Sequence, residues 1–321
     1  MLKKETDLWS TLSYTPIDQR SSVADYLDEI KPDRVVIAHN FMWPNLLRVI
    51  IDREISLFLI EHSIDTAKRA KVVWAGLWED VYHHSSLITS SDQETIDYLS
   101  DQKTLNNIKL TESIRYLSAY MHAAHNWSDE LIGQFCGRRP TLILASVHPE
   151  DIQIFAPIYE ELVKSHQLLI VPHHIDVENI TRIKKTLGGR IMTHSHIEEL
   201  NEDPILIVDR MGILKYLYRY ASLAYIGGGF GQGIHSAQEA VPYDIPIIYG
   251  PKYTKFAYAK QLIKNGRAYS ITTSSELLNL VSTLQSSELS SSANPTSKEK
   301  LEQDVAYICL LYTSPSPRDR G

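Results

Sequence analysis

Short apolar runs alternate with amphipathic stretches along most of the chain. In the first half, runs at 34–38, 55–60 and 87–90 predict buried strands, and 18–30 and 43–52 predict helices. The second half repeats the pattern, with predicted strands at 141–145, 168–171, 205–208, 222–226 and 246–249 and predicted helices at 213–221 and 274–284. Strands that alternate with helices are typical of parallel sheets with helical crossovers, so we expect an α/β protein.

The same pattern divides the chain. The stretch 105–127 is polar and helical in character, without strand alternation, and we expect it to cross between two domains. This predicts one domain over 1–127 and a second over 128–285, a division that suits a chain of 321 residues. Residues 286–308 form a serine-rich loop and a partial terminal helix in this interpretation, and 309–321 are a separate tail.

A glycine-rich loop follows the predicted strand at 222–226. From Ile234 onward the pattern predicts a helix, with His235 and Glu239 four residues apart on one face. A strand, a glycine loop and a helix N-terminus in this order predict an anion site. Neither the dinucleotide fingerprint nor the P-loop motif fits this segment. The loop glycines are Gly227, Gly228, Gly229, Gly231 and Gly233.

The residue pattern of this segment is more specific than a general anion-binding motif. The pattern GGGFGxGIHxxxEAxxYxxPxIxGPxYxKFxxAxxLIxxGxAxSI resembles the C-terminal domain of 3-deoxy-D-manno-octulosonic acid (Kdo) transferases, particularly the Bacteroidetes type. These enzymes form glycosyltransferase family 30. The resemblance covers 227–271 without a gap, and one position departs from it, because Ser236 stands where the family has asparagine.

The resemblance implies a GT-B fold, in which two Rossmann-like domains with parallel sheets face a cleft. It also implies transfer of Kdo from CMP-Kdo to a lipid A precursor during lipopolysaccharide synthesis, at the cytoplasmic face of the inner membrane. No metal or other cofactor is expected, and no nucleic-acid partner. The residues that the resemblance assigns to the donor are the five loop glycines, His235, Glu239, Ser146, His148, His173, Met211, Gly212 and Lys255.

Some of these residues have simpler interpretations. Ser146 could be an ordinary helix N-cap before Pro149, and His173 could be an ordinary loop histidine. The pairs His83-His84, His173-His174 and His194-x-His196 lie in different segments, and the sequence does not unite them in one site. The segment 39–47 resembles the family's Glu-Thr-Glu-Leu-Trp-Pro-Asn with its acids replaced; alternatively, its Trp-Pro pair merely starts and packs a helix.

Both ends of the chain depart from the family pattern. The family's proposed general base, a glutamate in a Gly-Glu turn behind a hydrophobic anchor, has no counterpart between Met1 and Asp18, so we expect it upstream of Met1. Glu5 lacks the glycine and the preceding strand. The tail from Cys309 matches what a common sequencing adapter spells when it is translated, and we expect it to pack on nothing.

Composition narrows the classes that remain. A net charge of −7 disfavours a nucleic-acid binder, and two distant cysteines provide neither a disulfide framework nor metal spacing. No apolar run reaches the length of a membrane span, so the chain as written is expected to be soluble. Two alternatives stay open: another GT-B nucleotide-sugar enzyme (a transferase or an epimerase), and a non-catalytic nucleotide-sugar-binding protein. Preference for cytidine or uridine nucleotides would separate the enzymes.

Overall fold

A computed structural model describes residues 13–40, 43–64, 75–101, 105–197 and 200–286, together with Gln303 and Ala306. The chain divides into two compact units, 1–113 with 303–321, and 114–302. The sequence placed this division at residue 127 instead. The adapter-like tail, 309–321, lies outside the described residues, as does most of 286–308. Among the described helices, none is long and apolar enough to cross a membrane.

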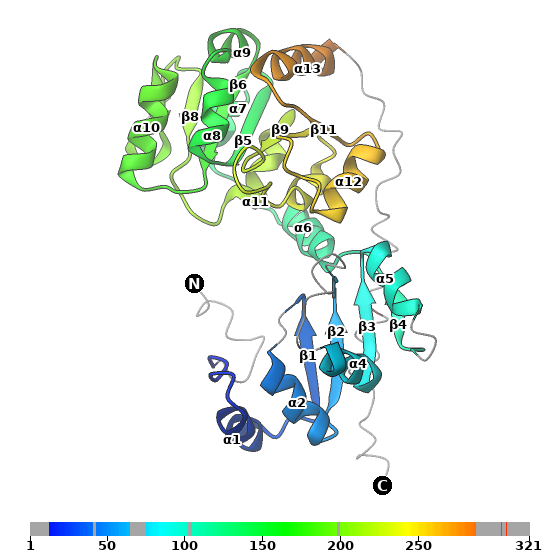
Figure 1. Cartoon of the computed structure of the whole chain (residues 1–321). Coiled ribbons are helices and arrows are strands. Elements are labelled where there is room, and N and C mark those ends of the chain that lie inside the picture. Colours follow the sequence, from blue (N-terminus) through cyan, green and yellow to red (C-terminus); the bar gives the residue numbers. More distant parts are fainter. Residues whose placement is uncertain are drawn as a thin grey trace. The chain divides into compact units, whose positions relative to one another are not determined.

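The first unit contains a parallel sheet with strand order β1-β2-β3-β4 (Figure 1). Buried side chains of its strands and helices, among them Leu57 and Leu47, form one apolar cluster. Helix α5 has a side-chain N-cap, since the Asp92 side chain accepts from the amide of Thr95. The elements are α1 (Arg20–Ile30), β1 (Arg34–Ala38), α2 (Pro44–Asp52), β2 (Ser56–Ile60), α4 (Ala75–His84), β3 (Ser85–Ser90), α5 (Gln93–Ser100) and β4 (Ile108–Leu110).

The stretch 105–127 differs from its prediction. It holds a strand, β4, which pairs with β3 in parallel from Ile108 to Leu110, and only then a helix, α6 (Ile114–Ala124). Three paired residues are too few to show alternation, so the pattern missed the strand. Helix α6 belongs to the second unit, because Tyr116 is buried in the core there.

The second unit contains a larger parallel sheet, with strand order β11-β10-β9-β5-β6-β8-β7 (Figure 1). The two parallel sheets confirm the predicted fold class. The remaining elements are α7 (Glu130–Cys136), β5 (Thr141–Val147), α8 (Pro149–Phe155), α9 (Tyr159–Ser165), β6 (Gln167–Pro172), α10 (Val177–Leu187), β7 (Ile191–Thr193), η2 (His194–His196), β8 (Ile205–Ile207), α11 (Leu214–Leu217), η3 (Tyr218–Tyr220), β9 (Leu223–Ile226), η4 (Gln238–Tyr243), β10 (Ile247–Tyr249), α12 (Ala257–Lys264), β11 (Ala268–Ser270) and α13 (Ser274–Ser286).

Both faces of this sheet are covered. Successive residues of a strand point to opposite faces, so Ile143 and Ala145 belong to one apolar cluster while Leu142 and Leu144 belong to the other. The first cluster also holds residues of α6, α7, α11 and α12, and the second holds residues of α8, α9, α10 and α13. Strands buried on both faces read as continuous apolar runs, which is why the sequence identified them.

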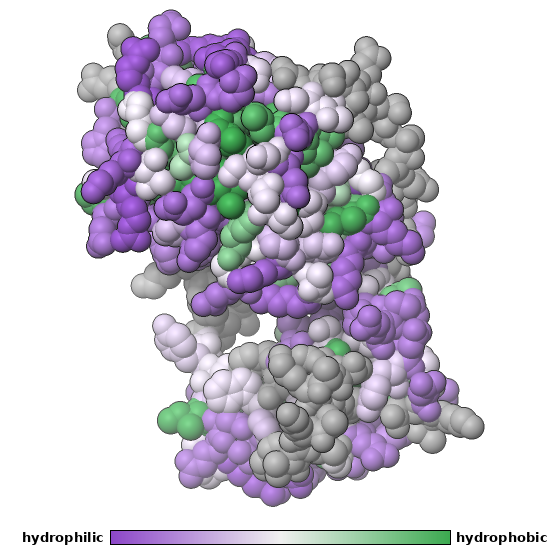
Figure 2. Space-filling model, turned by 45° about the horizontal axis from the view of Figure 1, so that its top comes forward, coloured by the Kyte–Doolittle hydropathy of each residue, from purple (hydrophilic) through white to green (hydrophobic). Residues whose placement is uncertain are grey.

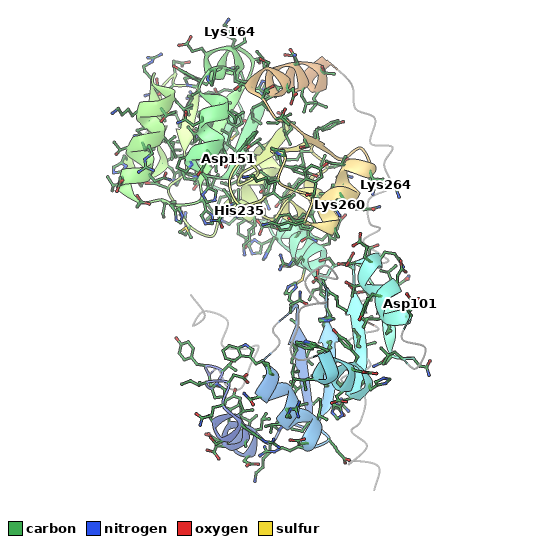
Figure 3. All side chains as sticks on the ribbon, viewed as in Figure 1. Asp101, Asp151, Lys164, His235, Lys260 and Lys264 are labelled. Atoms are coloured by element: carbon green, nitrogen blue, oxygen red, sulfur yellow. The ribbon has the colours of Figure 1, made fainter. Side chains whose placement is uncertain are left out.

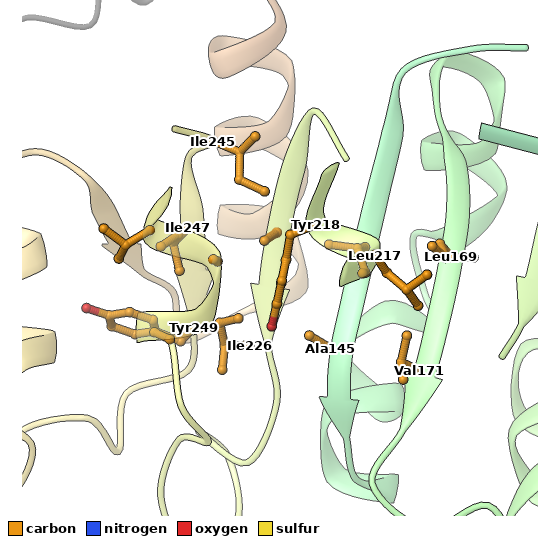
Figure 4. Packing of buried hydrophobic residues seen from close by; sticks show 14 of the residues in the cluster. Ala145, Leu169, Val171, Leu217, Tyr218, Ile226, Ile245, Ile247 and Tyr249 are labelled. Atoms are coloured by element: carbon orange, nitrogen blue, oxygen red, sulfur yellow. The ribbon is translucent and has the colours of Figure 1, made fainter. Parts of the chain in front are cut away.

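Tyrosines occupy positions 216, 218 and 220, in and just after α11. Tyr218 is fully buried in the first of these clusters, where Figure 4 shows it beside Leu217 and next to strand residues such as Ile226. The ring of Tyr216 stacks on Trp127, 5.3 Å between centroids. On the face of the second unit drawn in Figure 2, hydrophilic side chains surround small groups of hydrophobic ones, as is usual for a folded domain.

Candidate functional site

The order of the strands defines one special edge in the second unit. From β5 the chain adds β6, β7 and β8 on one side, and it then returns to add β9, β10 and β11 on the other. The topological switch point therefore lies between β5 and β9, which pair in parallel from Leu142 with Leu223 to Ala145 with Ile226. Open α/β sheets bind their ligands beyond the carboxyl ends of the strands at such a point.

The glycine loop lies directly at the end of β9. Its backbone folds back on itself, because the amides of Gly231 and Gly233 both donate to the carbonyl of Gly228 at 3.0 Å. Gly228 and Gly233 have φ of +89° and +139°, values that side chains other than glycine rarely allow. A Cβ on Gly229 would lie 2.6 Å from the nitrogen of Gly250, so the loop and the end of β10 meet backbone to backbone.

The helix predicted from Ile234 does not form. Residues 234–237 have no regular structure, and a 3-10 helix, η4, begins only at Gln238. The amide of His235 donates to the carbonyl of Gly227 instead of entering a helix, and Pro242 supplies no amide for an α-helical turn. The expected helix dipole behind the loop is therefore absent from this site, and His235 and Glu239 do not share a helix face.

Three histidines converge at this edge instead. His148 follows β5, His173 follows β6, and His235 lies beyond the loop that follows β9. Since β9, β5 and β6 are neighbours in the sheet, their carboxyl ends lie side by side and bring the three imidazoles together. The Nε2 atoms of His148 and His235 are 2.7 Å apart. The ring of His173 lies 4.6 Å from that of His148 and 4.4 Å from that of His235, between centroids.

The cluster favours neutral imidazoles. Burial, followed by the neighbouring rings of His173 and His148, lowers the pKa of His235 to about 4. Burial also lowers the pKa of His173, with further contributions from His148 and His174. At neutral pH the rings of His235 and His173 therefore present lone pairs and N–H donors rather than positive charges.

Stability at acid pH should reveal this cluster. Because the folded-state pKa of His235 lies below its ordinary value of 6.5, the unfolded chain binds more protons between pH 6.5 and pH 4. As the pH falls through that range, we expect this difference to lower the free energy of unfolding by about 1–2 kcal/mol, after allowance for solvent screening of a half-buried ring. All proteins are first treated with a chelator, and their free energies of unfolding are measured with urea. On acidification His235→Gln should lose less stability than the wild type, while the exposed control His196→Gln should follow the wild type. Parallel profiles for all three proteins would contradict the assignment.

A buried carboxylate holds this edge together. Asp151, in the first turn of α8, is fully buried and accepts three hydrogen bonds, from the amides of His148 (2.9 Å) and Gly228 (2.8 Å) and from the hydroxyl of Tyr225 (2.7 Å). It thereby connects the start of α8 to β9 and to the glycine loop; Figure 3 labels it together with His235. The sequence indicated only a helix start at Pro149 and did not reveal this role of Asp151.

Ser146 is neither an N-cap nor an ordinary strand residue. It has a φ of +52° at an irregularity of β5, between Ala145 and Val147, and the N-cap of α8 is His148. A Cβ on Gly227 would collide with the backbone of Ser146 and Val147, so the glycine loop begins in direct contact with this bulge. A bulge at this point re-aims the residues that follow it, including His148.

The remaining residues assigned to the donor have different surroundings. Lys255 lies against the loop, since its Nζ donates to the carbonyl of Gln232 at 2.6 Å. Burial raises the pKa of Glu239, and the charge of Lys215 opposes that shift. Met211 is 63% exposed and Gly212 has a φ of +81°, in the turn that follows β8.

In the first unit, the segment 39–47 follows β1, as predicted. His39 has a φ of +59°, and Trp43, 37% exposed, is the N-cap residue of α2 with Pro44 in its first turn. The side chain of Asn45 donates to the carbonyl of Asp18 at 2.7 Å. These contacts agree with the structural interpretation of this segment, and residues 41 and 42 lie outside the described ones.

Comparison with known proteins agrees with the resemblance found in the sequence. The family model for 3-deoxy-D-manno-octulosonic-acid transferase (kdotransferase) matches residues 1–118. The chain is 26% identical over 290 residues to the 3-deoxy-D-manno-octulosonic acid transferase of Rickettsia bellii, with 85% of this chain and 66% of that protein covered. For the Aquifex aeolicus transferase the identity is 25% over 295 residues, covering 89% and 75%. The family model and these relatives make the chain similar to 3-deoxy-D-manno-octulosonic acid transferases.

The comparisons also bear on the length of the chain and on its fold. The chain spans less than two thirds of the length of the Rickettsia relatives, 66% of one and 60% of another. Among solved structures, UDP-GlcNAc 2-epimerase from Neisseria meningitidis is similar, with a TM-score of 0.66 at 13% identity, covering 92% of this chain and 80% of that one. At this identity the likeness shows the fold alone, and that fold is the GT-B arrangement predicted from the sequence.

Proposed function

We propose that the protein is a Kdo transferase and that the edge between β5 and β9 of the second unit binds its donor, CMP-Kdo. One observation carries the proposal: the glycine loop and the imidazoles of His148 and His235 converge at the topological switch point. Similarity to the transferases suggests the chemistry, because these relatives are named for this transfer. The acceptor in this proposal is a lipid A precursor, and the protein works at the inner-membrane surface that holds it.

The chemistry of the transfer explains the residues. When the sugar leaves, its nucleotide carries the developing negative charge, which must be stabilised by donors aimed at the phosphate. Neutral imidazoles can donate through N–H groups, and they become stronger donors if the arriving anion raises their pKa. Lys255, already held at the loop backbone, adds positive charge on the same edge. The glycines let the phosphate approach the backbone closely.

Calorimetry with free nucleotides tests the proposal directly. We expect the chain to bind CMP and to bind UMP and UDP-GlcNAc more weakly. Preference for the uridine ligands would instead favour a different GT-B enzyme, and absence of CMP binding by folded protein would contradict the donor site. Transfer is then followed by incubating the protein with CMP-Kdo and a lipid A precursor and measuring the mass of the lipid. A folded protein that binds CMP-Kdo without transferring it would favour a binding protein.

Glu239 provides a matched mutational test. A partly buried carboxylate in this position can accept hydrogen bonds from the hydroxyls of a ribose, so we propose it as a ligand of the nucleoside. Glu239→Ala should weaken CMP binding by roughly 1–3 kcal/mol, the usual effect of losing a charged acceptor. The control is Glu178→Ala, which removes an exposed carboxylate of α10, and both variants should keep the wild-type circular dichroism. Equal CMP affinity in the two variants would exclude Glu239 from the site.

A further inference from the structure

The three imidazoles have a second property that the donor proposal does not use. One ligating nitrogen from each of His148, His173 and His235 can be chosen so that all three lie within 4.8 Å of one another. Among the described residues, these three are the set of histidine, cysteine, aspartate or glutamate side chains whose ligand atoms come close enough to share one metal ion. The three residues come from three separate segments, which the sheet brings together.

We propose that His148, His173 and His235 form a binding site for a divalent transition-metal ion of the zinc class. Imidazole nitrogens suit Zn²⁺, Co²⁺ and Ni²⁺, whereas Mg²⁺ and Ca²⁺ prefer oxygen ligands. Three protein ligands are also the number that leaves one position of a tetrahedral zinc ion open. No carboxylate belongs to this group, so a bound ion keeps its positive charge and directs it to the open position.

Metal binding requires the three side chains to adjust, while their backbone positions already bring the nitrogens together. The rings of His148 and His235 are tilted by 13° with centroids 5.0 Å apart, and their Nε2 atoms are 2.7 Å apart. Nitrogens so close cannot belong to rings stacked face to face, so the two rings meet edge to edge with both Nε2 atoms pointing inward. Zinc–nitrogen bonds of about 2.0–2.1 Å in a tetrahedron place two such nitrogens about 3.3 Å apart. To admit the ion, the pair must open by about half an ångström, the rings of His148 and His235 must turn until their lone pairs converge on it, and the exposed ring of His173 must rotate toward it.

The surroundings prepare the site through a hydrogen-bonded backbone. Asp151 is a positioning residue here, because its oxygens accept from the amides of His148 and Gly228 and thus hold two of the three ligand segments. Its three accepted bonds occupy the carboxylate, which leaves the imidazoles as the ligands.

Cobalt provides a direct test. Untagged, chelator-treated protein is titrated with Co²⁺ in the absence of nucleotide, followed by visible absorption. We expect one ion per chain, with the intense ligand-field bands of a four-coordinate site, and displacement by Zn²⁺ but not by Mg²⁺. His148→Ala, His173→Ala and His235→Ala should each weaken Co²⁺ binding at least 100-fold, more than the 10–100-fold typical of losing an outer-shell partner. The exposed control His196→Ala should bind as the wild type does.

Two results would overturn the proposal: failure of the wild type to bind Co²⁺, or wild-type affinity in His235→Ala. If the alanine variants do not fold, X-ray absorption of the wild-type Zn²⁺ complex decides, because three imidazole nitrogens around the ion support the site and fewer contradict it. Since no nucleotide is present in these measurements, their outcome is independent of whether the edge binds CMP.

Discussion

Asp151→Ala is expected to destabilise the second unit by about 3–5 kcal/mol. The substitution removes a fully buried carboxylate and leaves the amides of His148 and Gly228 and the hydroxyl of Tyr225 without their acceptor. Each buried donor left unsatisfied costs about 1–3 kcal/mol, and the three losses are not fully additive because the donors share one partner. The measurement is urea unfolding followed by circular dichroism, fitted with separate transitions for the two units.

Two variants serve as controls for Asp151. Tyr225→Phe removes one donor and keeps the carboxylate, so we expect a loss of about 0.5–1.5 kcal/mol. Glu150→Ala removes the exposed acid next to it and should change stability by less than about 0.5 kcal/mol. If Asp151→Ala and Glu150→Ala unfold at the same urea concentration, Asp151 does not hold the edge together.

Gly229→Ala is expected to cost about 2–3 kcal/mol of stability and to abolish measurable CMP binding. The new Cβ would lie 2.6 Å from the nitrogen and 2.7 Å from the Cα of Gly250, and backbone atoms cannot rotate away as a flexible side chain can. The loop must therefore shift from the end of β10, with the strain that overpacking brings. The same shift displaces the loop backbone from the donor site that we propose.

Gly231→Ala is the matched control within the same loop. A Cβ there would meet only the carbonyl oxygen of Gly228, at 3.6 Å, which is an ordinary contact. We expect wild-type stability to within about 0.5 kcal/mol. Thermal unfolding of the two variants measured side by side separates a steric effect from a general intolerance of the loop. Equal behaviour of the two alanine variants would show that the contact with Gly250 is unimportant.

The sequence by itself determined the elements whose signals are local. The apolar strands of the second unit, such as β5 and β6, could be predicted because a parallel strand covered on both faces needs apolar residues at every position. The family resemblance at the glycine loop could be recognised because one continuous segment carries it.

Only the tertiary structure decided the features that depend on distant segments. The sequence predicts the start of a helix at residues 234–237. In the structure the amide of His235 donates to the carbonyl of Gly227, and a backbone hydrogen bond to the carbonyl of Lys252 also holds this segment, so no helix forms there. The short β4 exists because β3 offers it a partner. His148, His173 and His235 meet because β9, β5 and β6 are adjacent in the sheet, an order that no local pattern encodes. Strand order is a property of the folded sheet, and it is what turns three separate histidines and one buried aspartate into a site.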